Sequence, residues 1–224
     1  MNIGMIVGIG PAATDYYYRY IIRKMADKNI NLNLMMAHAD TPTLLKNQSK
    51  NNIEEQVEIY LRLANRLLSS GAERLAITSI AGHFCIDEFM DKSSLNVINI
   101  IDSIKNELSK KNYKRIGLLG TKVVMETSFY SKLNSVEVAK LNDFDLNQVH
   151  DAYISMATTG FSTEAHKQIF DGAAKKLISE HACDCILLAG TDLSLVYNDA
   201  SPADFPAVNC AQLHADDIVQ FACS

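Results

Sequence analysis

Two apolar segments of this chain each lead into side chains that can exchange protons or bind a polar ligand. The first is Leu75–Ile77, followed by Ser79 and His83, and the second is Cys185–Leu188, followed by Gly190, Thr191 and Asp192. Such runs are typical of buried strands in α/β proteins, whose carboxyl ends carry the ligand site. Ser79, His83 and Asp192 are therefore the candidate catalytic residues.

Each candidate has both a functional and a structural interpretation. An alcohol is too weak an acid to rest as an alkoxide, so Ser79 needs a neighbouring base, and His83 could be that base if the chain turns into a helix between them. Ser79 could instead only bind the ligand or cap that helix. Asp192 could act as a base, bind the ligand together with Thr191, or cap the helix that follows its strand. The residues alone leave these alternatives open.

The elements that must position these residues alternate between strands and helices. Apolar runs predict strands at 2–7, 32–37, 75–78, 115–121, 185–189 and 207–211, and apolar periodicity predicts helices at 12–25, 52–68, 85–91, 148–158, 163–180 and 212–223. This alternation favours parallel sheets covered by helices on both faces.

Two pairs of segments resemble each other and indicate an internal repeat. They are 3–10 with 116–121, and 77–83 with 187–192. The repeat predicts two similar α/β lobes with a ligand cleft between them. One continuous doubly wound sheet is the alternative, because every β/α unit resembles the next in such a sheet.

Composition limits the classes of partner. The chain has 224 residues, of which 48% are hydrophobic, and a net charge of −5. The acidic balance and scattered lysines argue against nucleic acid. No apolar run reaches the length of a membrane span, and no signal peptide is recognisable. Five cysteines without metal-site spacing predict reduced thiols in a cytoplasmic protein. A small-molecule ligand is expected, without a membrane or nucleic-acid partner.

A glycine-containing loop follows the first predicted strand. It reads Gly8-Ile9-Gly10-Pro11 and leads into Ala13-Thr14. Backbone N–H groups and a helix N-terminus at such a loop can hold a carboxylate, although a tight turn alone would also explain it. The third glycine of a dinucleotide fingerprint is absent, so no nicotinamide cofactor is expected.

Several other polar residues have mainly structural interpretations. His38 and Asp40 form a His-x-Asp pair, which is weak evidence for a metal, and no metal site is predicted. Cys85 and Cys210 are potential replacement thiols, but buried packing is the favoured interpretation. His214 is expected to be a hydrogen-bonded structural histidine in the last helix.

Four segments resemble the aspartate/glutamate racemase family in order and spacing. They are the loop from Gly8 with Tyr17-Tyr18; Gly71-Ala72-Glu73 through His83; Arg115–Thr121 with Met125-Glu126 and Phe129-Tyr130; and His214–Asp217. They extend over nearly the whole chain. The resemblance implies a two-lobed α/β fold, a cofactor-independent enzyme of amino-acid metabolism and a homodimer. It places residues 1–97 with 207–224 in one lobe and 98–206 in the other.

The resemblance also shows where this sequence departs from the family. Family members move a proton at the α-carbon with two thiols on opposite faces of the substrate. In an ungapped alignment the first thiol position is Ser79 and the second is Gly190. Gln148 falls near the family's carboxylate-binding lysine, and Gln48 falls where relatives place an Arg or Gln that grips a carboxylate. The two-thiol mechanism is therefore not available here.

The predicted ligand-binding set combines the loop, the two strand ends and a turn. It consists of Ile9, Gly10, Pro11, Gln48, Ile80, Ala81, Thr121, Gly190 and Thr191. The main functional hypothesis is a cofactor-independent isomerase or proton-transfer enzyme acting on an amino acid or small carboxylic acid. The alternatives are a degenerate racemase homologue that binds a small acid or a protein without turnover, and a repurposed biosynthetic lyase or decarboxylase.

Overall fold

The chain folds into two compact units of parallel sheet and helix. The computed structural model describes residues 1–129 and 131–224, so Tyr130 of the third family-like segment lies outside the described residues. The first unit is Met1–Ile100 with His214–Ser224, and the second is Ile101–Leu213. No helix in the described part of the chain is both long and apolar enough to cross a membrane.

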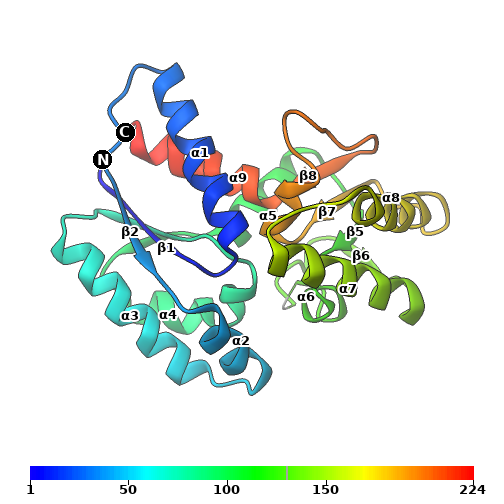
Figure 1. The fold of residues 1–224 in the computed structure, drawn as a ribbon, viewed down its shortest axis with the longest axis horizontal. Coiled ribbons are helices and arrows are strands. Elements are labelled where there is room, and N and C mark those ends of the chain that lie inside the picture. Colours follow the sequence, from blue (N-terminus) through cyan, green and yellow to red (C-terminus); the bar gives the residue numbers. More distant parts are fainter. Residues whose placement is uncertain (130) are drawn as a thin grey trace. The chain divides into compact units, whose positions relative to one another are not determined.

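The first unit is built on a four-stranded parallel sheet in the order β2-β1-β3-β4. Its strands are β1 (Ile3–Val7), β2 (Leu34–His38), β3 (Arg74–Ile77) and β4 (Asn96–Ile98). Its helical elements are α1 (Pro11–Asp27), α2 (Thr41–Ser49), α3 (Ile53–Ser69), the 3-10 helix η1 (Ala81–Cys85), α4 (Ile86–Lys92) and most of α9 (Cys210–Ala222). Figure 1 shows α1 and α9 over one face of this sheet and α3 and α4 over the other.

The second unit repeats this plan with the strand order β6-β5-β7-β8, also parallel. Its strands are β5 (Arg115–Leu119), β6 (Glu137–Ala139), β7 (Cys185–Leu188) and β8 (Ala207–Asn209). Its helical elements are α5 (Ile100–Lys110), α6 (Lys122–Glu126), α7 (Asp143–Thr159), α8 (Glu164–Ser179) and the 3-10 helix η2 (Thr191–Leu195). The paired helices α7 and α8 are visible in Figure 1 beside this sheet, and α8 packs on β5 and β7.

The shared strand order explains the internal repeat in the sequence. β1 and β5 hold the same inner position in their sheets, and so do β3 and β7. These inner strands are almost wholly buried, which accounts for their uninterrupted apolar runs. The two separate sheets confirm the predicted α/β class and exclude one continuous doubly wound sheet.

The last strand is in a different sheet from the one expected. Residues 207–224 were assigned to the first lobe, but β8 pairs in parallel with β7 of the second sheet. The ladder continues through the Ile186 N–H, which donates to the Pro206 carbonyl at 2.9 Å. Pairing with β7 covers the apolar Val208, and the chain passes to the first unit only within α9.

Three of the elements that the sequence did not predict are short and carry little apolar periodicity. They are α2, α6 and β6. α2 is rich in polar residues, with only Leu44 and Asn47 buried, so its sequence resembles a loop. Its N-terminus is fixed by Asp40, whose carboxylate accepts the Thr43 N–H at 2.9 Å. Asp40, part of the His-x-Asp pair that was only weak evidence for a metal, is therefore a helix cap.

Candidate functional site

The first cluster of predicted residues lies just beyond the carboxyl end of β3. The chain turns into η1 directly after Ser79, because Ile80 already has helical dihedral angles. This turn brings His83 Nδ1 to 2.5 Å from the Ser79 carbonyl oxygen. A carbonyl can only accept, so Nδ1 carries the ring proton. The imidazole thus bonds the backbone of Ser79 through Nδ1, and not its hydroxyl.

His83 is inaccessible to solvent, and its Nε2 has no hydrogen-bond partner among the described residues. Burial lowers the pKa of His83 to about 3, and the nearby His214 contributes to the decrease. The ring is therefore neutral at physiological pH, with an unprotonated Nε2. A buried acceptor without a partner is costly, so Nε2 is a candidate contact for a ligand donor.

Two helices fix the position of η1. Gln48 Nε2, from α2, donates to the Ala81 carbonyl at 3.1 Å. The Tyr60 hydroxyl, from α3, donates to the Gly82 carbonyl at 3.2 Å. A β-carbon at Gly82 would overlap this hydroxyl and would approach Ile9 Cδ1 to 3.5 Å. The predicted residues Ile9, Gln48 and Ala81 are thus brought together around one short helix.

The glycine loop after β1 is largely bonded to itself. The Gly8 N–H donates to the Thr14 hydroxyl oxygen at 3.0 Å, and that hydroxyl donates to the Gly10 carbonyl at 3.2 Å. Gly10 is left-handed and precedes Pro11 at the start of α1, where no side chain caps the helix. The N–H of Gly8 is therefore already engaged and does not point to an anion at this loop.

In the second unit, Thr121 follows β5 and caps α6, with its hydroxyl oxygen accepting from Val124 N at 3.5 Å. The next backbone N–H, of Lys122, donates to His150 Nδ1 of α7 at 3.1 Å. A β-carbon at Gly120 would come within 2.8 Å of the Ala189 carbonyl oxygen, so the ends of β5 and β7 are in close contact. Thr121 therefore belongs to the same end of the sheet as the residues that follow β7.

The residues after β7 form the second cluster. Gly190 is extended and precedes η2, and the side chains of Thr191 and Asp192 are buried. The Tyr153 hydroxyl, from α7, donates to Asp192 Oδ2 at 2.9 Å. A β-carbon at Gly190 would overlap Cε2 of the Tyr153 ring. Gly190 and Asp192 thus both lie against a tyrosine that the sequence did not identify.

Tyr153 is neutral and acts as a donor. Burial raises its pKa well above the usual 10, and the neighbouring charge of Asp192 raises it further. The only sequence signal for this residue is indirect, since a glycine at position 190 leaves room for a bulky neighbour. Nothing in the sequence indicates that the neighbour comes from the middle of α7.

The buried cysteines and His214 behave as structural residues. Burial raises the pKa of Cys85 to about 12 and also raises that of Cys210, so both thiols stay protonated at neutral pH. His214 Nε2 donates to the Ile98 carbonyl at 2.8 Å, and its Nδ1 accepts from the Tyr17 hydroxyl at 2.9 Å. This confirms the expectation that His214 is a hydrogen-bonded structural histidine.

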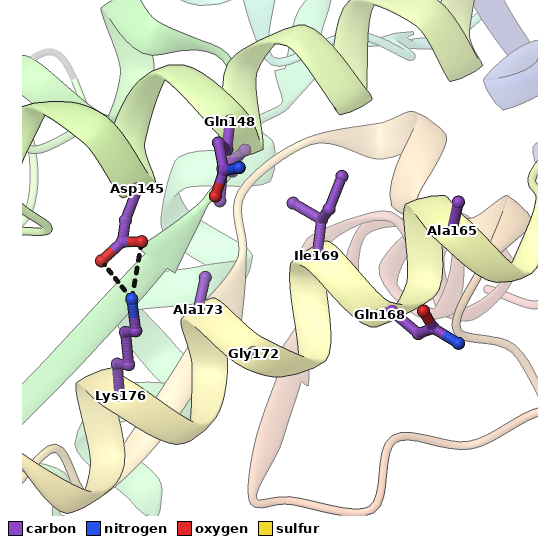
Figure 2. Close-up of a pocket in the computed structure, with 9 residues that line it drawn as sticks. Asp145, Gln148, Ala165, Gln168, Ile169, Gly172, Ala173 and Lys176 are labelled. Carbon is purple, nitrogen blue, oxygen red and sulfur yellow. Dashed lines mark hydrogen bonds and ion pairs between the residues drawn. The ribbon is translucent and has the colours of Figure 1, made fainter.

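Gln148 lines a separate hollow of about 380 Å³ between α7 and α8. Figure 2 shows Lys176 at one end of this hollow, with its ammonium facing Asp145 on the neighbouring helix. Lys176 Nζ lies 2.7 Å from both carboxylate oxygens of Asp145. The Asp145 carboxylate thus offsets the charge of Lys176 in this hollow.

Comparison with known proteins assigns the chain to a family. The family model for Asp/Glu/hydantoin racemases matches residues 6–218, nearly the whole chain. The chain belongs to the Asp/Glu/hydantoin racemase family. Among the solved structures to which this racemase-family protein is similar is a provisionally named Asp/Glu racemase from Yersinia pestis, with a TM-score of 0.86, 22% identity and coverage of 100% of both chains.

Two further structures of similar fold come from Pyrococcus horikoshii and Francisella tularensis. An aspartate racemase homologue from Pyrococcus horikoshii has a TM-score of 0.82 and 21% identity, covering 100% of this chain and 99% of the other. Glutamate racemase from Francisella tularensis, solved with D-glutamate, has a TM-score of 0.64 and 13% identity, covering 98% of this chain and 80% of the other. At these identities the likeness supports the racemase-family fold and not a particular substrate.

Proposed function

We propose that this protein is a cofactor-independent isomerase or proton-transfer enzyme that acts on an amino acid or a small carboxylic acid. The observation that carries the proposal is the Asp192 carboxylate, only 5% exposed and held by a neutral phenol directly after the inner strand β7. A buried carboxylate at a strand end is suited to act as a general base. Thr121 and Thr191, at the same end of the sheet, supply hydroxyl groups for a polar ligand.

The proposed chemistry is proton exchange at the carbon next to a carboxyl group. The Asp192 carboxylate forms an O–H bond as the substrate C–H bond breaks, and the electron pair stays on the substrate, delocalised into its carboxyl group. The proton held by Asp192 exchanges with solvent, and the carboxylic acid then returns a solvent-derived proton to the carbon, which restores both the C–H bond and the Asp192 carboxylate. Inversion of the carbon would require a second proton-transfer residue.

Deuterium exchange tests the proposal directly. The native protein is incubated in D₂O, with a chelator and no added cofactor, against a panel of L- and D-amino acids and small carboxylic acids. Proton NMR is expected to show loss of the α-proton signal for one class of acid. Exchange without inversion indicates one base, and inversion indicates two.

The matched variants are Asp192→Asn and Asp204→Asn. Asp204 has an exposed side chain in the same unit, so its substitution should leave exchange unchanged. Asp192→Asn should reduce the exchange rate by roughly 100-fold or more, in line with the usual contribution of a general base. Full exchange in Asp192→Asn would exclude this residue as the base.

The second candidate function is binding of a small acid without turnover. It is favoured by Gly190, because no side chain can act on a ligand from this position. Under this alternative an acid from the panel would raise the melting temperature, and the increase would grow with the concentration of the acid, without any exchange. The family resemblance further leads us to propose that the protein is a cytoplasmic homodimer. Light scattering on the purified protein would test the dimeric state.

A further inference from the structure

Tyr153 occupies the space into which a side chain at position 190 would extend. A β-carbon on Gly190 would overlap Cε2 of the ring and would lie 2.7 Å from Cζ and 2.8 Å from the hydroxyl oxygen. Tyr153 is itself buried in the middle of α7, a regular helix that packs on η2. The ring therefore has little freedom to move aside, and glycine is required at position 190 as long as tyrosine is at 153.

The same tyrosine holds the carboxylate two residues further along. Its hydroxyl donates to Asp192 Oδ2 at 2.9 Å, within a buried environment. A titratable group that also interacts with this pair is the Cys210 thiol, at the start of α9, which burial keeps protonated by raising its pKa. The neighbours of the Asp192 carboxylate thus include a neutral phenol and a neutral thiol.

We propose that Tyr153 is the positioning residue of a carboxylate base. Its ring excludes any side chain from position 190, and its hydroxyl fixes Asp192, so that proton transfer at the end of β7 uses the carboxylate of Asp192. The inference rests on the proposed function and names the residue that organises the same site. It explains why Gly190 and Tyr153 occur together in one chain.

The test of this role is Tyr153→Phe, which keeps the ring and removes the hydroxyl. Exchange at neutral pH should slow by about 10- to 100-fold, as expected for the loss of one hydrogen bond to a charged group. The acid limb of the pH–rate profile should move to higher pH, because the ionised carboxylate loses a donor that favours it. A merely structural tyrosine would not move this limb.

Tyr197→Phe is the matched control. The Tyr197 hydroxyl donates to Asp171 Oδ1 at 2.7 Å in the same unit, so its loss removes a similar tyrosine–aspartate bond away from Asp192. Both variants should lower the melting temperature, but only Tyr153→Phe should change the exchange rate and its pH profile. If the two variants behave alike in exchange, the positioning role is wrong even though the enzyme is active.

A stability cycle tests the packing without any assay of activity. Gly190→Ala is measured in the native background and again with Tyr153→Ala. Alanine at position 190 should lower the melting temperature in the presence of tyrosine and have little effect once the ring is removed. If alanine at position 190 lowers the melting temperature equally in both backgrounds, Tyr153 does not restrict which residue fits at position 190, and the inference is overturned.

Absence of exchange by the native protein on every acid would instead overturn the proposed function, and the catalytic role of Tyr153 with it.

Discussion

Beyond one inner strand of each sheet, a tyrosine from a distant part of the chain fills the space that a side chain would need, so that position requires glycine. A β-carbon at Gly82 would overlap the Tyr60 hydroxyl, and a β-carbon at Gly190 would overlap the Tyr153 ring. In both cases the tyrosine also makes a hydrogen bond to the segment that contains the glycine, to a backbone carbonyl in one and to a carboxylate in the other. The two units therefore use the same solution to fix the short 3-10 helix beyond an inner strand.

The first prediction concerns Gly82→Ala, which should lower the free energy of unfolding by about 1 to 3 kcal/mol because the new methyl group meets a buried hydroxyl. Gly172→Ala in α8 is the control, since a β-carbon there meets nothing within 4 Å. That substitution should be neutral or stabilise by up to about 1 kcal/mol through helix propensity. Urea unfolding of both variants is the measurement, and equal stability would contradict the packing argument.

At the scale of the elements, α7 and α8 form an antiparallel pair with well-defined N-termini. The Asn142 side chain caps α7, and Thr163 forms a reciprocal cap with His166 at α8. Lys176, near the end of α8, reaches Asp145 in the first turn of α7. The Asp145 side chain is only 8% exposed, so it depends on this lysine for its charge balance.

The second prediction follows from that dependence. Lys176→Met should lower the free energy of unfolding by about 1 to 2 kcal/mol, because it leaves a nearly buried carboxylate without its cation, while the lysine itself is partly exposed. Lys175→Met is the control, since Lys175 and Asp204 form an exposed pair at 3.8 Å. Its effect should stay within about 0.5 kcal/mol. Thermal unfolding measures both, and an equally small effect for Lys176→Met would refute the argument.

At the scale of the whole molecule, acid stability should depend on two buried histidines. Burial lowers the pKa of His83 to about 3 and that of His214 to about 4. As pH falls below about 6.5, the unfolded chain takes up protons at these residues while the folded chain does not. Their effect is therefore to lower stability as pH falls from about 6.5 to 3, and the loss is complete below the folded pKa values.

The third prediction is the size and origin of this slope. Each histidine should contribute up to about 1.4 kcal/mol of lost stability per pH unit in that window. Chemical denaturation between pH 7 and 4 measures the slope in the native protein, His83→Gln and His181→Gln. The first variant should have a shallower slope, and the second, at a partly exposed site, should match the native protein. An unchanged slope in His83→Gln would be evidence against a buried neutral imidazole.

Part of the site could be anticipated from sequence because it depends on local structure. Ser79 and His83 are four residues apart, so a helical turn between them makes a contact possible. Which atoms meet was not predictable: His83 bonds the carbonyl of Ser79 and not its hydroxyl, since the ring orientation depends on the packing of η1. Gln48 and Ala81 were each predicted to bind the ligand. Only the structure shows that Gln48 donates a hydrogen bond to the backbone carbonyl of Ala81.

The sequence by itself determined the α/β class, the repeated strand–helix units and the family frame, because uninterrupted apolar runs and helical periodicity are local properties of the chain. Only the tertiary structure decided that β8 joins the second sheet and that Tyr153 lies against Gly190 and Asp192. Both outcomes depend on non-local contacts, between β7 and β8 and between α7 and η2. Such contacts follow from side-chain volume and strand pairing across the fold, which no local pattern records.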